Sequence, residues 1–350
     1  MRSKSSHKNC CVSVSLCALM AISGYAAQAP GQARTAVEID REPQQVEARV
    51  KTDQDIFDFH SGFWMNLHHF LYQQALAQKA GREGRPIRGA GEVVSVEALN
   101  DEEKSVWAAV LESYQKNWVN RDLAFDGDLI NINYRLAELE NQTTLKQSGL
   151  PDELIVALDR AAPLYRTHWW KEHDRINRSW IGAVASLIRK HGRILSEQFA
   201  TTYREPWAKG PIRAEVAIYA NWAGAYTTTD PTLITISSAD ARQQGTAALE
   251  AMFHEASHAM IDAVRKGIEK ECAAQSKQAP RGLWHAVLFH TTGEIVKRAL
   301  FKDGQKDYEP YAYKQGVFRE YRQLMEKHWQ PYLDGKSDFA EAIKRMVAGL

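Results

Sequence analysis

The chain has 350 residues, in which 44 Lys and Arg balance 43 Asp and Glu. This near-neutral charge, without a basic stripe anywhere along the chain, excludes the electrostatic footprint of a nucleic-acid-binding protein. The length is enough for one large domain or two smaller ones.

The N-terminus predicts an export signal. Three cations lie among the first eight residues, and residues 11–23 form an apolar run that is too short for an ordinary transmembrane helix. Small residues come next, and we expect cleavage after Ala26, which makes residues 1–26 a signal peptide. The protein is therefore expected in the periplasm or outside the cell, with no membrane span after cleavage. An uncleaved anchor is the alternative.

Cleavage would leave Cys272 as the only cysteine, because the other three lie in the signal peptide. An intramolecular disulfide and a cysteine-based zinc site are then both excluded. Residues 27–54 are polar and contain Pro, Gln and Glu, which predicts a linker or mobile arm.

Residues 55–205 predict a helical region. An aromatic-rich stretch leads into a helix that ends at about Lys79. Adjacent residues on a helix point about 100° apart, so His68 and His69 are expected to be buried and hydrogen-bonded rather than paired on one metal ion. Asn100 can cap a second helix, with Glu103 closing a capping box.

Further helices are expected in this region, and three strands after it. The helices cover about residues 129–140, a stretch that starts at Pro151 and is interrupted by Pro163, and a long stretch over 164–203. The alternating segments 214–220, 223–227 and 232–237 predict strands. Their appearance after the helices marks residues 206–350 as a second region.

The sequence His254-Glu255-Ala256-Ser257-His258 lies in an apolar helical run, which we expect to span Thr246 to Arg265. Residues four apart share a helix face, so the two imidazoles can bind one zinc ion. Glu255 lies close enough to take a proton from a zinc-activated water. A chance pattern is the alternative, but an acid and two histidines within an apolar helix need a reason to be there.

A short sheet followed by an H-E-x-x-H helix resembles the zincin metallopeptidases. The metzincin branch needs glycine and histidine where this chain has Ile261 and Val264. The resemblance is therefore to the gluzincins, and it covers about residues 214–300. The sequence pattern as a whole predicts a mainly helical α+β protein: a helical N-terminal region, then a zincin-like catalytic unit with a small antiparallel sheet before the H-E-x-x-H helix.

The resemblance also implies that a downstream helix supplies the third zinc ligand. That helix is expected over residues 282–298, and Glu294 is the predicted ligand beside His254 and His258. His290 shares the face of Glu294, where it can stabilise an oxyanion or hydrogen-bond Glu294. His285, His290 and another acid are the alternative third ligands. Gly293 would allow this helix to approach the zinc helix closely.

In one respect the chain departs from the gluzincin pattern. Arg298 stands one helical turn after Glu294, where that pattern often has an acid. Glu250 or Asp262 can instead supply the carboxylate that orients a ligand imidazole.

We therefore expect a secreted Zn²⁺-dependent hydrolase with Glu255 as general base. A peptidase is favoured, because a strand edge beside a zinc helix can bind an extended peptide as an added strand. The alternatives are a zinc enzyme that acts on another amide or ester, and a helical extracytoplasmic binding protein with structural zinc or none.

Overall fold

The computed structural model describes residues 56–84 and 91–350. The predicted signal peptide and linker lie outside these residues. Within the described part of the chain, no helix is both long enough and apolar enough to cross a membrane.

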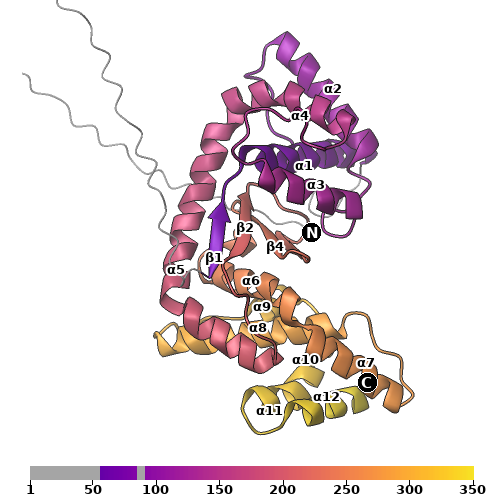
Figure 1. The fold of residues 1–350 in the computed structure, drawn as a ribbon, viewed down its shortest axis with the longest axis vertical. Coiled ribbons are helices and arrows are strands. Elements are labelled where there is room, and N and C mark those ends of the chain that lie inside the picture. Colours follow the sequence, from indigo (N-terminus) through magenta and orange to yellow (C-terminus); the bar gives the residue numbers. More distant parts are fainter. Residues whose placement is uncertain (1–55, 85–90) are drawn as a thin grey trace, which may run out of the picture. The chain divides into compact units, whose positions relative to one another are not determined.

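A four-stranded sheet joins the beginning of the described chain to its middle (Figure 1). Its strands, in spatial order, are β1 (Phe57–His60), β2 (Ile212–Ala217), β4 (Leu233–Ser237) and β3 (Ala225–Thr228). The pairs β1–β2 and β2–β4 are parallel, and β3 runs antiparallel to β4. Because β3 pairs only with β4, it forms one edge of the sheet.

The expected α+β, mainly helical fold is confirmed, with two corrections to the sheet. All three expected strands are present, but the sheet is mixed rather than antiparallel. β1 was not expected, because its alternation of Phe57 and Phe59 with polar neighbours covers only four residues and runs straight into the aromatic-rich start of a helix. The long helical connection from β1 to β2 allows these two strands to lie parallel, whereas a tight hairpin would have made them antiparallel.

The connection between β1 and β2 consists of helices. They are α1 (Phe63–Glu83), α2 (Asp101–Asn117), α3 (Gly127–Glu138), α4 (Asp152–Tyr165) and α5 (Lys171–Tyr203). The predicted cap of α2 is confirmed, since Asn100 accepts from the Glu103 amide and the Glu103 carboxylate accepts from the Asn100 amide, both at 2.9 Å. Two donors at the helix start are thereby satisfied.

Pro163 does not interrupt its helix, which corrects the prediction. It lies inside α4, and the chain continues through a π-helical turn, Arg166–Trp170, directly into α5. Proline removes one backbone donor from the helix. The wider π turn after it accommodates this irregularity without ending the helix.

The histidines of α1 are buried and hydrogen-bonded, as predicted. His68 Nδ1 lies 3.0 Å from the Tyr114 hydroxyl. His69 joins the Met65 carbonyl to the hydroxyl of Tyr226 on β3. This pair therefore ties α1 to α2 and to the sheet.

After β4 the chain forms only helices and the turns between them. These helices are α6 (Thr246–Ser257), α7 (Asp262–Ala274), α8 (Leu283–Lys302), α9 (Tyr311–Gln315), α10 (Arg322–Leu324), α11 (Gln330–Leu333) and α12 (Phe339–Ala348). The two faces of the sheet enter different hydrophobic clusters. Tyr226 and Leu233 belong to the cluster of α1–α4, and Ile234 and Ile236 to that of α5–α8 and α12. The sheet therefore separates the two clusters, and α6 packs into the one that contains Ile234 and Ile236.

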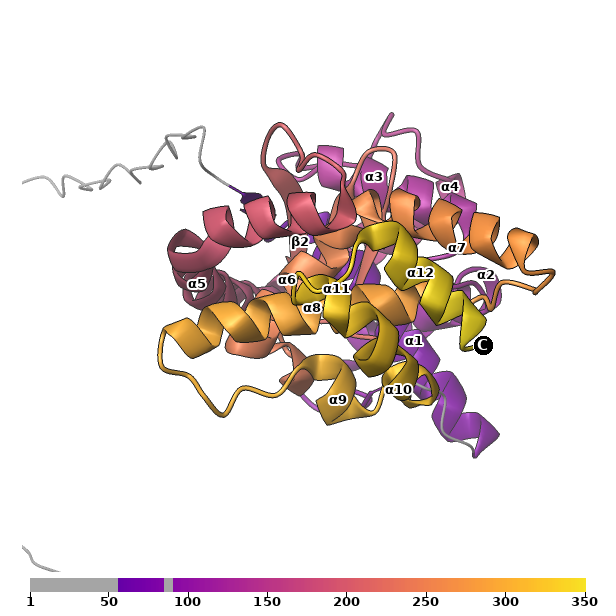
Figure 2. The same cartoon turned by 90° about the horizontal axis from the view of Figure 1, so that it is seen from below.

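Helix α6 contacts both α5 and α8, and α9 lies beside α8 (Figure 2). The motif helix is shorter than expected. It ends at Ser257 and passes through a 3-10 turn, His258–Met260, before α7 begins. Ile261 and Val264 are nevertheless buried, because α7 turns back onto the same core.

Candidate metal centre

His254 and His258 lie on one face at the end of α6. The backbone of His258 keeps helical angles, φ −57° and ψ −30°, although α6 ends one residue earlier. The two rings are therefore still one turn apart, with centroids separated by 5.1 Å.

A third imidazole completes a triangle with these two. His285 lies in the first turn of α8, and its ring centroid is 5.2 Å from that of His254 and 5.0 Å from that of His258. The Nε2 atoms of His254 and His285 face each other at 3.2 Å. One nitrogen from each of the three residues lies within 4.8 Å of the other two.

This donor set fits a zinc ion. Tetrahedral coordination with Zn–N bonds of about 2.0–2.1 Å places ligand nitrogens roughly 3.3–3.4 Å apart, close to the 3.2 Å between His254 and His285. Two neutral rings facing each other can share at most one hydrogen bond, so a metal ion would use the lone pairs that this arrangement brings together. Within the described residues, this is the one cluster of three such side chains with this spacing.

Burial lowers the pKa values of all three imidazole rings. Desolvation lowers the pKa of His258 to about 3 and that of His285 to about 4, and it lowers the pKa of His254 well below the usual range. The rings are therefore neutral at pH 7, which is the state that binds zinc. His254 is buried, whereas His258 and His285 are partly exposed, so the centre is open to solvent on one side.

Aromatic contacts fix the orientation of His285. Trp284 stacks on it, with centroids 4.8 Å apart and planes inclined by 10°. The guanidinium of Arg265, from α7, lies over the ring of Trp284, 3.8 Å from its centroid. The stack of Arg265, Trp284 and His285 therefore holds the third imidazole in place from a different helix.

Close packing of α6 on α8 brings the third histidine to the first two. The centroid of the Phe289 ring lies 3.9 Å from that of the His254 ring and 4.8 Å from that of the His285 ring. Further along α8, a Cβ on Gly293 would lie 3.3 Å from Glu250 Oε1 and 2.6 Å from Pro310 Cβ. The predicted role of Gly293 in a close approach is confirmed.

Glu294 is not part of the cluster, and His285 occupies the place predicted for it. Nine residues separate the two along α8, which is about 13.5 Å of rise and half a turn of rotation. Glu294 Oε1 instead lies 3.6 Å from Lys297 Nζ. Burial raises the pKa of Glu250, and the negative charge of Glu294 adds to that rise. The sequence predicted His285 only as an alternative ligand. Its side chain reaches the other two histidines because α8 begins only two residues before it.

His290 also lies away from the three imidazoles. Its Nε2 is 2.7 Å from Gln330 Oε1, which only accepts, so this nitrogen carries the proton. Its Nδ1 then accepts from the Tyr313 hydroxyl at 2.7 Å. Both nitrogens are occupied, and the predicted hydrogen bond to Glu294 is absent among the described contacts of His290.

Glu255 lies beside the cluster, outside the ligand set. Its Oε2 is 3.9 Å from His258 Nε2 and accepts from the Thr227 hydroxyl at 2.8 Å. Burial raises the pKa of this carboxyl to about 7, although the Thr227 hydrogen bond opposes the shift. A carboxylate with a pKa near the working pH is well suited to accept and return a proton.

Neither of the two acids expected to orient a ligand imidazole does so. Glu250 accepts from the Tyr308 hydroxyl and, at 3.0 Å, from the Tyr311 amide. Asp262 is exposed and pairs with Lys266 at 3.4 Å. The buried Nδ1 of His254 has no hydrogen-bond partner among the described residues.

Glu250 makes the stability of the metal-free protein depend on pH. Burial raises its pKa from 4.5 to about 7. Between pH 4.5 and about pH 7 the Glu250 carboxyl is ionised in the unfolded chain but still protonated in the folded protein. The free energy of unfolding therefore falls as pH rises through this range, and the loss is complete above pH 7. In Glu250→Gln the fall in unfolding free energy with rising pH should be smaller by about 3 kcal/mol.

Urea unfolding at pH 5 and pH 8, with chelator present, measures this effect. The fall in unfolding free energy between the two pH values should be smaller in Glu250→Gln than in the unsubstituted protein. Glu269→Gln, which changes an exposed acid on α7, is the matched control. Equal falls in all three proteins would show that Glu250 is ionised in the folded state without cost.

No protein-family model, no curated protein and no solved structure matches this chain. The function must therefore be inferred from the residues and the geometry of the metal centre.

Proposed function

We propose that this protein is a zinc-dependent hydrolase, most suited to peptides, in which His254, His258 and His285 hold the metal. The observation that carries this proposal is the cluster of three neutral imidazoles, in which the Nε2 atoms of His254 and His285 lie 3.2 Å apart. Three histidines leave one position of a tetrahedral zinc ion open, which is the arrangement of catalytic rather than structural sites.

His254, His258 and His285 would hold the zinc ion, which when bound would supply a water molecule with a pKa near 7 and a polarised substrate carbonyl. Glu255 would accept the proton of the attacking water and return it to the leaving amine. Its position supports this role, because its Oε2 lies 3.9 Å from His258 Nε2 without belonging to the ligand cluster. Thr227 holds that oxygen at 2.8 Å and so fixes the carboxylate in place.

The sheet supports a peptide as the substrate. Thr227 belongs to β3, the edge strand, so that edge reaches the carboxylate of the predicted general base. An extended peptide that added to β3 would pass close to Glu255 and the three imidazoles. Esters and other amides share the same chemistry, so the substrate screen must include them.

Hydrolysis assays with the purified, zinc-loaded protein test the proposal. A mixture of quenched fluorescent peptides, with small amides and esters in parallel, should yield peptide cleavage that a zinc chelator abolishes and added zinc restores. Cleavage of esters or small amides alone would keep the metal chemistry and change the substrate class. Absence of hydrolysis of any of these by zinc-loaded protein would overturn the proposed activity.

Export is part of the same proposal. It depends on residues 1–26, which lie outside the described residues. Mass spectrometry of the protein secreted by its host should find an N-terminus at Ala27. An intact N-terminus at Met1 would contradict signal cleavage.

A further inference from the structure

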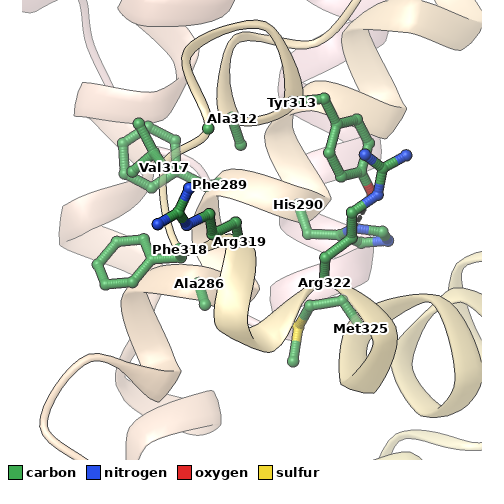
Figure 3. A pocket seen from close by; sticks show the side chains of 11 residues that line it. Ala286, Phe289, His290, Ala312, Tyr313, Val317, Phe318, Arg319, Arg322 and Met325 are labelled. Atoms are coloured by element: carbon green, nitrogen blue, oxygen red, sulfur yellow. Dashed lines mark hydrogen bonds between the residues drawn. The ribbon is translucent and has the colours of Figure 1, made fainter.

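A small pocket lies next to the three imidazoles. Its volume is about 60 Å³, and it shares the ring of Phe289 with the candidate metal centre, since that ring contacts both His254 and His285. The lining includes Phe289, His290, Tyr313, Phe318, Arg319 and Arg322 (Figure 3). No Asp or Glu lines it, so its charged side chains are all cations.

Arg319 is the cation in this lining whose charge is not used within the described protein. Its side chain is directed toward the pocket (Figure 3), and it has no hydrogen bond or ion pair to any described residue. Arg322, by contrast, pairs with Glu326 at 2.8 Å and lies 4.3 Å from the centre of the Tyr313 ring. The nitrogens of His290 are both occupied.

Phe318, the residue before Arg319, anchors the backbone from which the exposed Arg319 side chain extends. Phe318 has a left-handed backbone, φ 51°, which is uncommon for a large side chain. Its ring fills the space beside Gly282, where a Cβ would lie 2.8 Å from it, and it packs 5.3 Å from the ring of His285. Phe318 therefore holds the start of the 3-10 turn Arg319–Tyr321 against the start of α8, beside the third imidazole.

We propose that this pocket takes a carboxylate group of the substrate and that Arg319 selects it. A guanidinium binds a carboxylate through two parallel hydrogen bonds, and the space available suits a small anionic group rather than a large side chain. The ring of Phe289 lines the pocket and also contacts two of the histidines, so a carboxylate bound there would lie near the bond that is hydrolysed. This selection deepens the proposed function and depends on it.

Two sources of carboxylate share this chemistry: an acidic side chain and the C-terminus of a peptide. Binding measurements separate them. One peptide series exchanges Glu for Gln at each position in turn, and a second pair compares a free C-terminal acid with its amide. The full chain carries Glu255→Gln, so that the peptides are not consumed, and it is measured both with zinc and without it.

The Kd of the preferred carboxylate-bearing peptide should be about tenfold lower than that of its neutral partner. Arg319→Met should abolish this preference, and Arg319→Lys should retain part of it. Arg189→Met, which removes an exposed arginine of α5 outside the pocket lining, is the matched control and should leave the preference intact.

Equal affinities for charged and neutral peptides would overturn the inference, as would a preference that survives in Arg319→Met. Failure of the proposed function is a separate result. It would appear as a protein that binds no zinc or hydrolyses nothing, while the charge preference is still measured in the zinc-free protein.

Discussion

Replacing His285 with alanine should abolish stoichiometric zinc binding, whereas replacing Glu294 with glutamine should leave it intact. His285 Nε2 faces His254 Nε2 at 3.2 Å, and Glu294 stands outside the cluster. Loss of a hydrogen-bond partner behind a metal ligand costs about 10–100-fold in affinity, and loss of one of three ligands should cost more.

Metal analysis and competition with a chromophoric chelator measure these affinities. The two variants serve as controls for each other, since both change α8. If Glu294→Gln lost zinc while His285→Ala kept it, the ligand set implied by the gluzincin resemblance would be correct and the one proposed from the geometry would not. Circular dichroism of both variants should match that of the unsubstituted protein.

Replacing Glu255 with glutamine should eliminate hydrolysis while zinc stays bound. The substitution keeps the size of the side chain and removes its ability to take a proton. General bases contribute about 10²–10⁴-fold to enzymatic rates, so kcat/KM should fall by at least about 100-fold. Thr227→Val should give a smaller loss, because it removes only the hydroxyl that holds Glu255 Oε2 at 2.8 Å.

Steady-state kinetics on a cleaved peptide, with zinc content measured on the same samples, tests this role. Glu269→Gln on α7 changes an exposed acid and should retain full activity. Unchanged turnover in Glu255→Gln would remove the carboxylate from the mechanism. Loss of zinc in that variant would assign Glu255 to the metal itself.

The sequence predicted well those features that depend on neighbouring residues. The capping box of Asn100 and Glu103 formed as expected, because its two hydrogen bonds lie within four residues. The His68–His69 pair is buried and bonded, since adjacent positions on a helix cannot face one point. The pairing of His254 and His258 depends equally on the helix period.

Features that depend on tertiary packing were predicted less well. Whether His285 or Glu294 lies beside His254 depends on the position of α8 along the axis of α6. The spacing of residues within α8 does not determine that position. The break at Ser257 was missed because the apolar stripe continues into α7, where Val264 reaches the same core by another route. The sheet order depends on β1, whose partner is β2, far along the chain.

The most direct test of the metal centre is X-ray diffraction from crystals of the zinc-loaded protein, recorded on both sides of the zinc absorption edge. We expect one anomalous peak, about 2.0–2.1 Å from a nitrogen of each of His254, His258 and His285, with one coordination position free of protein ligands. A peak coordinated by Glu294 in place of His285, or no peak at the three histidines, would contradict the proposed centre.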